Sequence, residues 1–311
     1  MNPERLLAEV TDADELPAAL AELLDQQRAT WPALREGEAA LAASPMRPLA
    51  DGDAALVAQA NLRRSTSTFA RTDAASVAAR PCFLCADNLP DEERGVGFGP
   101  LVALPNPFPA VRDHLTLAAR EHVPQRIAGR IELMHDVARA LGEDAFVLYN
   151  GPRCGASAPD HFHFQSGRLD TMPIFEHSAL RTARGLSVMY AGARNAFVVR
   201  TEAPAAAAQL VTDCLRRIAV NQPDEDEPMV NILSTYRDGH HITLLFPRTR
   251  HRPGDFFTAK NALAISPAAL EMAGLVVVCD EAQYDGLSAA SVERIFSEVC
   301  VSAALMREAL E

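Results

Sequence analysis

The sequence predicts an α+β fold in which short strands alternate with helical segments and pair as antiparallel hairpins. Apolar runs of strand length fall into two series along the chain, and each series is interrupted by one segment with helical periodicity. Asp238-Gly239 lies between two of these runs and is a strong signal for a tight hairpin turn. With 311 residues, of which 48% are hydrophobic and 23% charged, the chain can form one large or two modest domains.

Residues 1–79 precede the first series, and we expect them to form a helical lead-in. Apolar residues recur with helical spacing over residues 3–28, and residues 54–64 resemble a second, shorter helix. Three prolines between these segments mark a looser connection.

The remaining elements follow from periodicity. A predicted helix over residues 125–141 interrupts the first series of strands, at 101–104, 114–118, 145–149 and 161–165. A predicted helix over residues 204–220 interrupts the second series, at 195–200, 230–236, 241–246 and 275–279. Residues 291–310 are predicted to close the chain as a helix, and the acidic run 224–227 is expected to be a solvated loop.

The two series contain a short internal echo. His114-Leu115-Thr116-Leu117 in the first resembles His241-Ile242-Thr243-Leu244 in the second, and a turn with basic residues and a histidine follows each. A duplicated α+β unit explains the echo, and chance similarity between two strands is the alternative.

Charge and composition restrict the partners of this chain. Its 29 Lys and Arg residues against 41 Asp and Glu give a net charge of −12, so we expect no binding to nucleic acid, whereas a small phosphorylated substrate remains compatible. The first residues carry no signal peptide and no later run reaches the roughly 18 apolar residues of a membrane helix, which predicts a cytoplasmic protein without membrane association. Most of the six cysteines are expected to be reduced and buried.

The run Asp160-His161-Phe162-His163-Phe164-Gln165 carries the strongest sign of chemistry. On a strand, the two histidines and the glutamine share one face while the phenylalanines enter the core on the other. The run follows a glycine-containing stretch, residues 150–157, whose backbone amides can steady the oxygens of a phosphate while an imidazole attacks phosphorus. The pattern therefore predicts nucleotidyl transfer. The alternative is a half-buried strand whose histidines face solvent.

A metal site is predicted from a second motif. Cys82-Phe83-Leu84-Cys85 is a C-x-x-C knuckle, and His122 and His161 are the natural partners for a tetrahedral zinc site. The alternatives are a redox dithiol and two buried cysteines that bind nothing. Pro90 and the acidic residues after the knuckle disfavour the long helix that a redox dithiol normally begins.

Together these motifs resemble the active-site signature of the histidine-triad (HIT-like) superfamily, specifically its nucleotidyltransferase branch. That branch includes galactose-1-phosphate uridylyltransferase, diadenosine tetraphosphate phosphorylase and the GDP-sugar phosphorylases. The resemblance covers residues from about 80 to 280, and from end to end the chain is most similar to a bacterial domain family without an assigned function. The matching residues are Asn150-Gly151, Gly155-Ala156-Ser157, Pro159 and His161-Phe162-His163-Phe164-Gln165.

The resemblance implies a role for each matching residue. It makes His163 the nucleophile and Gln165 the donor to the α-phosphate, with Ser157 and Asn150 as contributors to the phosphate cradle. It also gives a further set of residues that would contact the nucleotide. Arg153 belongs to this set because it lies close to the glycine-containing stretch. That set is Asn150, Gly155, Asn106, Phe108 and Arg153.

The same resemblance makes Cys82, Cys85 and His161 ligands of a structural zinc ion. His122 is the favoured fourth ligand, and His114 is its nearby rival. The implied fold is a HIT-like antiparallel sheet with flanking helices, duplicated into a catalytic half (residues 80–190) and a second half (residues 191–311). The second half resembles the carboxy-terminal domain of dinucleoside tetraphosphate phosphorylases.

The implied activity is transfer of a nucleotidyl group through a covalent intermediate on His163. The substrate would be a nucleoside diphosphate sugar or a dinucleoside polyphosphate, and the acceptor a phosphate or a sugar phosphate. A glutamine at position 165 cannot shuttle protons, which disfavours water as the acceptor. A nucleotide hydrolase and a non-catalytic nucleotide sensor are the alternatives. Uridylyltransferase relatives complete their sites across a dimer, so the resemblance also makes a homodimer possible for this chain.

Overall fold

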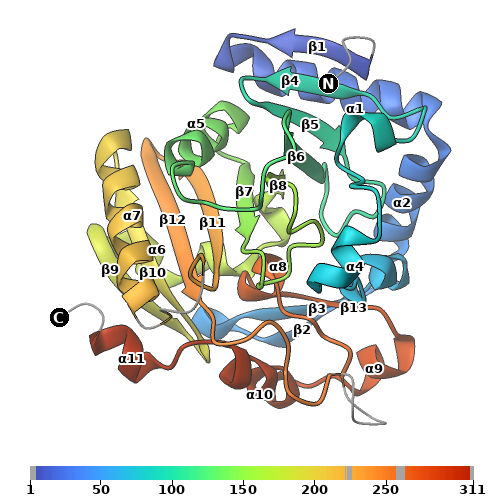
Figure 1. The fold of residues 1–311 in the computed structure, drawn as a ribbon. Helices are drawn as coiled ribbons and strands as arrows, with labels where there is room; N and C mark the ends of the chain where they lie inside the picture. Colours follow the sequence, from blue (N-terminus) through green and yellow to red (C-terminus); the bar gives the residue numbers. More distant parts are fainter. Residues whose placement is uncertain (1–4, 221, 223–225, 257–262, 309–311) are drawn as a thin grey trace.

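The computed structural model describes residues 5–220, 222, 226–256 and 263–308, and its largest element is a ten-stranded sheet (Figure 1). Every ladder from β4 to β9 is antiparallel, and β1 joins β4 in parallel at one edge. In sheet order the strands are β1 (Leu6–Val10), β4 (Gly95–Phe98), β5 (Leu101–Pro105), β6 (Leu115–Ala119), β8 (His163–Arg168), β7 (Ala145–Asn150), β11 (Val230–Arg237), β12 (His240–Pro247), β10 (Arg194–Thr201) and β9 (Gly185–Ala191).

The sheet contains the same four-strand unit twice. The first unit has the order β5-β6-β8-β7 with helix α5 (Ile131–Leu141) between β6 and β7 in the chain. The second unit has the order β9-β10-β12-β11 with helix α7 (Pro204–Val220) between β10 and β11. The two units meet where β7 pairs with β11. The prediction of a duplicated α+β fold with an antiparallel sheet is therefore confirmed.

The sequence echo, however, aligns strands that are not equivalent. His114-Leu115-Thr116-Leu117 leads into β6, whose counterpart in the second unit is β10, whereas His241-Ile242-Thr243-Leu244 lies in β12, the counterpart of β8. Alternating small polar and apolar residues suit many strands with two covered faces, so four matched positions carry little information. The predicted division between residues 190 and 191 falls within β9, one residue before its end and before its partner β10 begins, and it stays a prediction.

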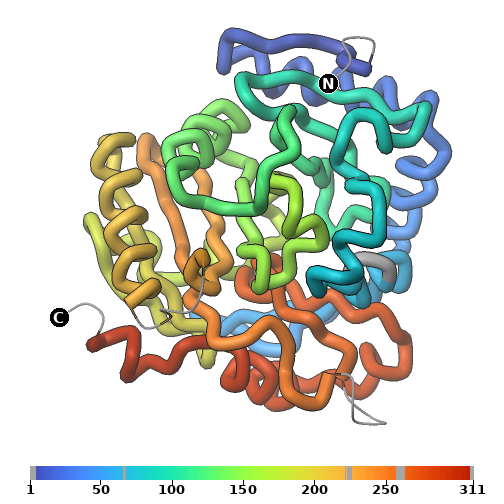
Figure 2. The backbone as a smooth tube through the Cα atoms, in the orientation of Figure 1, coloured from blue at the N-terminus to red at the C-terminus, as the bar shows by residue number. Residues whose placement is uncertain are grey.

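Helices cover one face of the sheet. Helices α5 and α7 pack on this face and on each other, and α1 (Leu16–Thr30) packs on β4 and β5 (Figure 2). Phe162 and Phe164 point into the apolar core on this side. The other helices are α2 (Pro32–Ala43), α3 (Ser65–Thr68), α4 (Ala74–Ala78), α6 (Ser178–Thr182), α8 (Ala269–Met272), α9 (Glu281–Gly286), α10 (Ala289–Val299) and α11 (Ala303–Glu308).

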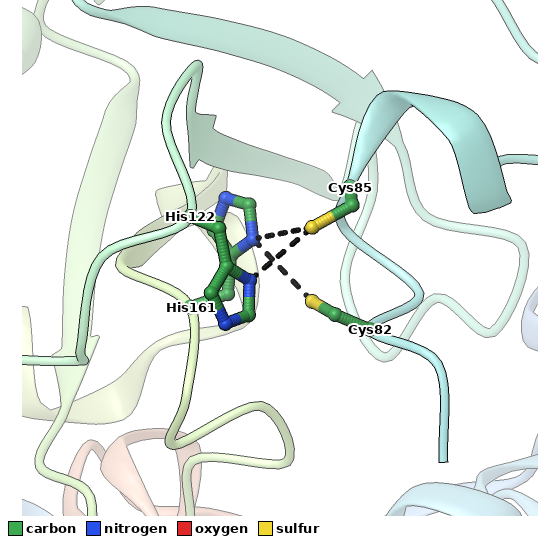
Figure 3. Close-up of side chains that lie close together, drawn as sticks. All are labelled: Cys82, Cys85, His122 and His161. Carbon is green, nitrogen blue, oxygen red and sulfur yellow. Dashed lines mark hydrogen bonds between the residues drawn. The ribbon is translucent and has the colours of Figure 1, made fainter.

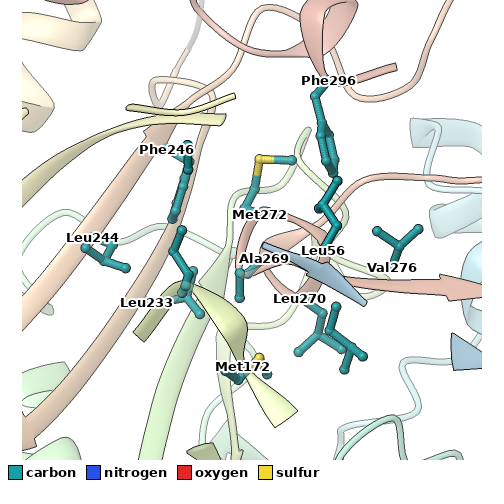
Figure 4. Close-up of a cluster of buried hydrophobic side chains, with 14 of the residues drawn as sticks. Leu56, Met172, Leu233, Leu244, Phe246, Ala269, Leu270, Met272, Val276 and Phe296 are labelled. Atoms are coloured by element: carbon teal, nitrogen blue, oxygen red, sulfur yellow. The ribbon is translucent and has the colours of Figure 1, made fainter. Parts of the chain in front are cut away.

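A three-stranded sheet covers the opposite face of the second unit. It consists of β13 (Leu275–Val278), β3 (Leu56–Ala60) and β2 (Met46–Ala50), with β13 parallel and β2 antiparallel to β3. Leu56 and Val276 belong to one buried cluster with Leu244 and Phe246 of β12 and Phe296 of α10 (Figure 4). The second unit is therefore packed on both faces.

The lead-in contains strands that its sequence pattern does not indicate. The predicted helix over residues 54–64 is wrong, because Leu56–Ala60 forms the central strand β3. One partner of β3 comes from residues Leu275–Val278, and such distant pairing overrides local periodicity. The prediction of one helix over residues 3–28 is wrong at its start, because β1 occupies Leu6–Val10 before α1 begins at Leu16.

Two further predictions need correction. The closing helix is divided into α10 and α11, with Cys300 between them paired to Arg248, and residues 309–311 lie outside the described residues. In the acidic run, residues 224 and 225 also lie outside them, and Asp226 is exposed. Glu227 is buried and accepts hydrogen bonds from the Tyr149 hydroxyl and from the Ile127 backbone at 2.6 Å. It is therefore a packing residue and not part of a solvated loop.

Within the described ranges, no helix combines the length and the apolar character that crossing a membrane requires.

Candidate active site and metal cluster

A cavity of about 570 Å³ lies on the face of the first unit that the helices leave free. Strands β5, β6 and β8, the glycine-containing loop between β7 and β8, and the knuckle segment all contribute to its wall. Arg153, which sequence proximity suggests for this site, is exposed and does not line the cavity. The other residues expected around the nucleotide do line it, namely Asn106, Phe108, Asn150, Gly155, Ser157, His163 and Gln165.

His163 is the first residue of β8, and its ring is held in one orientation. Its Nδ1 lies 2.8 Å from the backbone oxygen of His161. Because a carbonyl only accepts hydrogen bonds, Nδ1 carries the proton in the neutral ring and Nε2 keeps its lone pair. Burial lowers the pKa of His163 to about 4, although the hydrogen bond to His161 opposes this shift. The ring is therefore neutral at pH 7, as a nitrogen nucleophile must be.

Gln125 fixes the backbone around His163, a role that sequence reasoning missed. Its side-chain oxygen accepts from the His163 N–H at 2.8 Å, and its amide donates to the His163 oxygen at 2.9 Å and to the Asn150 oxygen at 3.0 Å. Gln125 thereby ties the end of β7 to the start of β8 across the glycine-containing loop. A lone buried glutamine 38 residues from its partner leaves no local signal in the sequence.

Gln165 is oriented by His114. The Ala110 N–H donates to Nδ1 of His114 at 3.2 Å, so Nε2 carries the proton and donates to Oε1 of Gln165 at 2.8 Å. This contact leaves the amide NH2 of Gln165 as a donor on the cavity side. His114, the rival for the fourth metal ligand, is thus engaged elsewhere.

The loop between β7 and β8 is anchored to the second unit. Asn231 of β11 donates to the side-chain oxygen of Asn150 at 2.8 Å and to the Cys154 oxygen at 2.7 Å. Gly155 has φ +99° and packs so tightly that a Cβ would lie 2.6 Å from the Cβ of Ala268. Ser157 makes no side-chain hydrogen bond with the described part of the chain, so its hydroxyl is available at the cavity wall.

Arg248 serves this loop as a structural residue. It is fully buried, and its guanidinium donates to the side-chain oxygen of Asn231, to the Pro267 oxygen at 2.9 Å and to the Val299 oxygen at 3.1 Å. These contacts hold the asparagine that anchors the loop, which explains a buried arginine better than phosphate binding does.

Two cysteines and two histidines converge beside the cavity (Figure 3). The ligand atoms of Cys82, Cys85, His122 and His161 all lie within 4.8 Å of one another. Cys82 Sγ lies 3.3 Å from Nδ1 of His161, and Cys85 Sγ lies 3.2 Å from Nδ1 of His122. Tetrahedral zinc, with bonds of about 2.3 Å to sulfur and 2.0 Å to nitrogen, separates its ligands by roughly 3.3–3.8 Å. The cluster could hold such an ion with small adjustments.

The surroundings of the cluster also suit a cation. Nε2 of His161 donates to the Ala119 oxygen at 2.8 Å, which leaves Nδ1 deprotonated toward the cysteines. Burial, together with the hydrogen bond and charge of Cys82, raises the pKa of Cys85 to about 11, so thiolates here need a positive charge nearby. A single 3-10 turn, Ala86–Asn88, follows the knuckle, which disfavours the redox alternative.

Charged residues from distant segments complete the cavity, and no sequence motif points to them. Burial raises the pKa of both carboxyl groups in the wall, Glu93 to about 8 and Glu271 in the same direction. Both carboxyl groups are therefore poorly suited to hold a charge without a partner. The arginines of the wall are Arg64, Arg71, Arg80 and Arg252. A molecule of net charge −12 thus has a cavity that suits an anionic ligand.

Comparison with known proteins agrees with this picture at the level of the fold. A family model described as "Domain of unknown function (DUF4922)" matches residues 23–168, from within α1 to the end of β8. No curated protein matches the chain.

Among solved structures, yeast Ap4A phosphorylase Apa2 in complex with Ap4A is similar with a TM-score of 0.62 and 17% identity, over 90% of this chain and 98% of that one. The same yeast enzyme in complex with AMP gives a TM-score of 0.59 and 19% identity, over 91% and 96% of the two chains. The HIT-like α+β fold expected from the sequence resemblance is therefore confirmed.

Proposed function

We propose that this protein is a nucleotidyltransferase of the phosphorylase type, which cleaves the pyrophosphate bond of a dinucleoside polyphosphate or a nucleoside diphosphate sugar. The observation that carries the proposal is the orientation of His163, whose Nδ1 is engaged with the His161 oxygen while the residue lines a cavity that suits an anion. Yeast Ap4A phosphorylase, which shares the fold, provides independent support for a nucleotide substrate.

The reaction begins with attack of His163 Nε2 on the α-phosphorus. A P–N bond forms, the bond from the α-phosphorus to the bridging oxygen breaks, and the leaving phosphate takes the electron pair. The imidazolium that results keeps its Nδ1–H on the His161 oxygen, which stabilises the positive charge. An oxygen of the acceptor then attacks phosphorus, the P–N bond breaks, and the electron pair returns to Nε2.

Gln165 favours a phosphate acceptor over water. Its amide NH2 can donate to an oxygen of the α-phosphate because His114 already occupies its carbonyl oxygen. An amide cannot accept a proton from attacking water, whereas the oxygen of inorganic phosphate or a sugar phosphate is already ionised. Ser157 and Asn150 would supply further donors at the loop, and Asn106 and Phe108, which also line the cavity, would contact the nucleoside.

The metal in this proposal is zinc, and its role is structural. Cys82, Cys85, His122 and His161 would hold the ion, which supplies a fixed link between the knuckle and the strand that begins at His163. Cys82 and Leu84 of the knuckle, together with Leu89 after it, pack on Val102, Leu104 and Ala118 of β5 and β6. The ion would thereby hold one wall of the cavity in place.

A phosphate-dependence assay tests the proposal. Purified protein is incubated with Ap4A, and separately with ADP- and GDP-sugars, with and without inorganic phosphate, and the products are resolved by chromatography. We expect cleavage that requires phosphate and gives a nucleoside diphosphate from each substrate. Equal turnover without phosphate would identify a hydrolase. Tight binding without cleavage or exchange of label would identify a sensor, and either result contradicts the proposal.

A further inference from the structure

One end of the cavity is apolar and lies along the sheet from the proposed nucleophile. Gln165, Thr116 and Leu104 occupy paired positions on the adjacent strands β8, β6 and β5. Two inter-strand spacings place Leu104 about 10 Å from Gln165. Leu84 and Leu89 pack with Leu104 in one buried cluster, and Trp31, Pro90 and Pro105 line the same cavity. A flat, weakly polar group attached to a phosphate at His163 can reach this end.

The carboxyl group of Glu93 stands in this wall without a partner. Glu93 is only 6% exposed, and it makes no side-chain hydrogen bond or ion pair with the described residues. Its loop is held firmly, since Gln27 donates to the Glu92 oxygen at 3.1 Å and accepts from the Arg94 N–H at 2.9 Å. Burial raises the pKa of Glu93 to about 8, and the charge of Arg5 only partly opposes this shift.

A buried carboxyl group without hydrogen-bond donors is costly in a folded protein, so a donor from a ligand would relieve the cost. The mechanism proposed above gives Glu93 no task. Trp31 follows Gln27, which holds the backbone on both sides of Glu93, by one helical turn, and it lines the same cavity. It is 4% exposed, and its indole N–H makes no hydrogen bond within the described residues. The apolar end therefore contains one strong acceptor group and one donor, both unused.

We propose that Glu93 reads the edge of a guanine base bound in this end of the cavity, accepting hydrogen bonds from its N1–H and its 2-amino group. Guanine presents two adjacent donors, which the two oxygens of one carboxylate can accept together. These hydrogen bonds favour the ionised form, so binding would lower the raised pKa of Glu93 and release its proton to solvent. Adenine presents one donor beside a ring acceptor, and uracil one donor between two carbonyl acceptors. The Trp31 N–H suits the remaining carbonyl of guanine. The assignment rests on the proposed function, since it places the α-phosphate of the nucleotide at His163.

Binding of mononucleotides tests this assignment. Dissociation constants for GMP, IMP, AMP and UMP are measured by titration calorimetry with the wild type, Glu93→Gln and the matched control Glu92→Gln, whose side chain is exposed. We expect GMP to bind wild type at least about tenfold more tightly than AMP, with IMP, which lacks the 2-amino group, between them. Glu93→Gln should weaken the binding of GMP about 10- to 100-fold and leave the affinity for AMP nearly unchanged, because one of the two acceptors of the side chain becomes a donor. Glu92→Gln should match wild type.

Two results would overturn the assignment. One is equal affinity of the wild type for GMP and AMP, and the other is an equal loss of affinity for GMP and for AMP in Glu93→Gln. Thermal unfolding of the variant shows whether the fold is intact, and the GMP and IMP comparison in wild type tests the base edge without any variant. Covalent transfer at His163 without a base preference contradicts only this assignment. A guanine preference without transfer contradicts only the proposed reaction.

Discussion

The two four-strand units of this protein share a strand order, yet within the described residues only the first carries a candidate active site. In the second unit, β11 and β12 are joined by the tight turn Asp238-Gly239, and the three-stranded sheet covers the face opposite the helices. In the first unit, residues 151–162 separate β7 from β8, and the equivalent face is hollow. Both units therefore offer the same arrangement of strands. The longer loop between β7 and β8, and the absence of a covering sheet on this face of the first unit in the part of the chain that the structure describes, leave room there for a ligand.

The counterpart strands also direct their histidines differently. On β8, His163 and Gln165 line the cavity, and Phe164 enters the core beneath the helices. On β12, Thr243 is hydrogen-bonded to His135 of α5 at 2.9 Å, and His241 stacks near the same ring, so these polar residues lie beneath the helices. Ile242 and Leu244 occupy the face that is hollow in the first unit.

Replacing the two histidines tests this contrast with the largest expected effect. His163→Ala should lower the rate of nucleotidyl transfer by about 10³-fold or more, since it removes the nucleophile. His241→Ala should keep the transfer rate close to that of wild type and lower only the melting temperature. Initial rates measured below the melting temperature of both variants check this expectation. Similar rates for the two variants would contradict the assignment of chemistry to the first unit.

Removal of the metal should weaken the first unit selectively. Among the described residues, only the first unit has such a cluster, formed by Cys82, Cys85, His122 and His161, so chelation should lower the melting temperature and weaken nucleotide binding together. A metal present at about 1,000 times its dissociation constant stabilises the native state by about 4 kcal/mol. Scanning calorimetry with and without chelator, alongside metal analysis of the purified protein, measures the loss.

The control is Cys82→Ser, which should behave like the chelated wild type and respond no further to chelator. Unchanged stability after confirmed removal of metal would contradict the structural role of the cluster.

A smaller effect is expected from two glycines that occupy the same conformational region. Gly155 has φ +99° and is packed against Ala268, whereas Gly239 has φ +74° and no atom within 4 Å of the position that a Cβ would occupy. Gly239→Ala should cost about 1 kcal/mol of unfolding free energy and leave kcat unchanged. Gly155→Ala should cost about 2 kcal/mol and also lower kcat/KM, because the glycine-containing loop between β7 and β8, which lines the cavity, must move. Urea unfolding and steady-state rates separate the two outcomes, and equal losses of activity would contradict them.

The last expectation concerns pH. Burial lowers the pKa of His163 to about 4 and that of His114 to about 3, below the unfolded value of about 6.5. Between these values the unfolded chain binds more protons, so the free energy of unfolding should rise with pH from about 4 to 6.5 and level off above it. Urea unfolding at several pH values should show this slope, and His163→Ala should reduce it by about one proton. An unchanged slope would show that His163 is solvated and titrates normally.

Candidate site residues are easiest to predict from the sequence where they lie close together in the chain. The knuckle and the run ending at Gln165 each specify neighbouring residues, and His122 could be named because zinc demands a fixed set of ligands. Such prediction fails for Gln125 and Glu93, which act through partners or cavity walls built from distant segments. Their positions depend on tertiary packing, and a single residue of this kind belongs to no periodic pattern or motif that would reveal it in the sequence.

The same limit explains the errors in the fold. Strands that alternate apolar and polar residues around a hairpin, such as β11 and β12, are predictable, because their partners are adjacent in sequence. Strand β3 has the local pattern of a helix, and its partner β13 lies more than 200 residues away. The resemblance to the HIT-like superfamily correctly predicts that the fold is duplicated, whereas the four-residue echo aligns strands that are not equivalent in the two units.

The most direct test of the central claim is to trap the nucleotide on the protein. Wild type is mixed with a substrate labelled at the α-phosphate in the absence of an acceptor, quenched at alkaline pH to preserve a phosphoramidate, digested and analysed by tandem mass spectrometry. We expect one nucleotidyl group per chain, attached to Nε2 of His163 and discharged when phosphate is added. Turnover of the substrate with no adduct at His163, or with label on another residue, would contradict it.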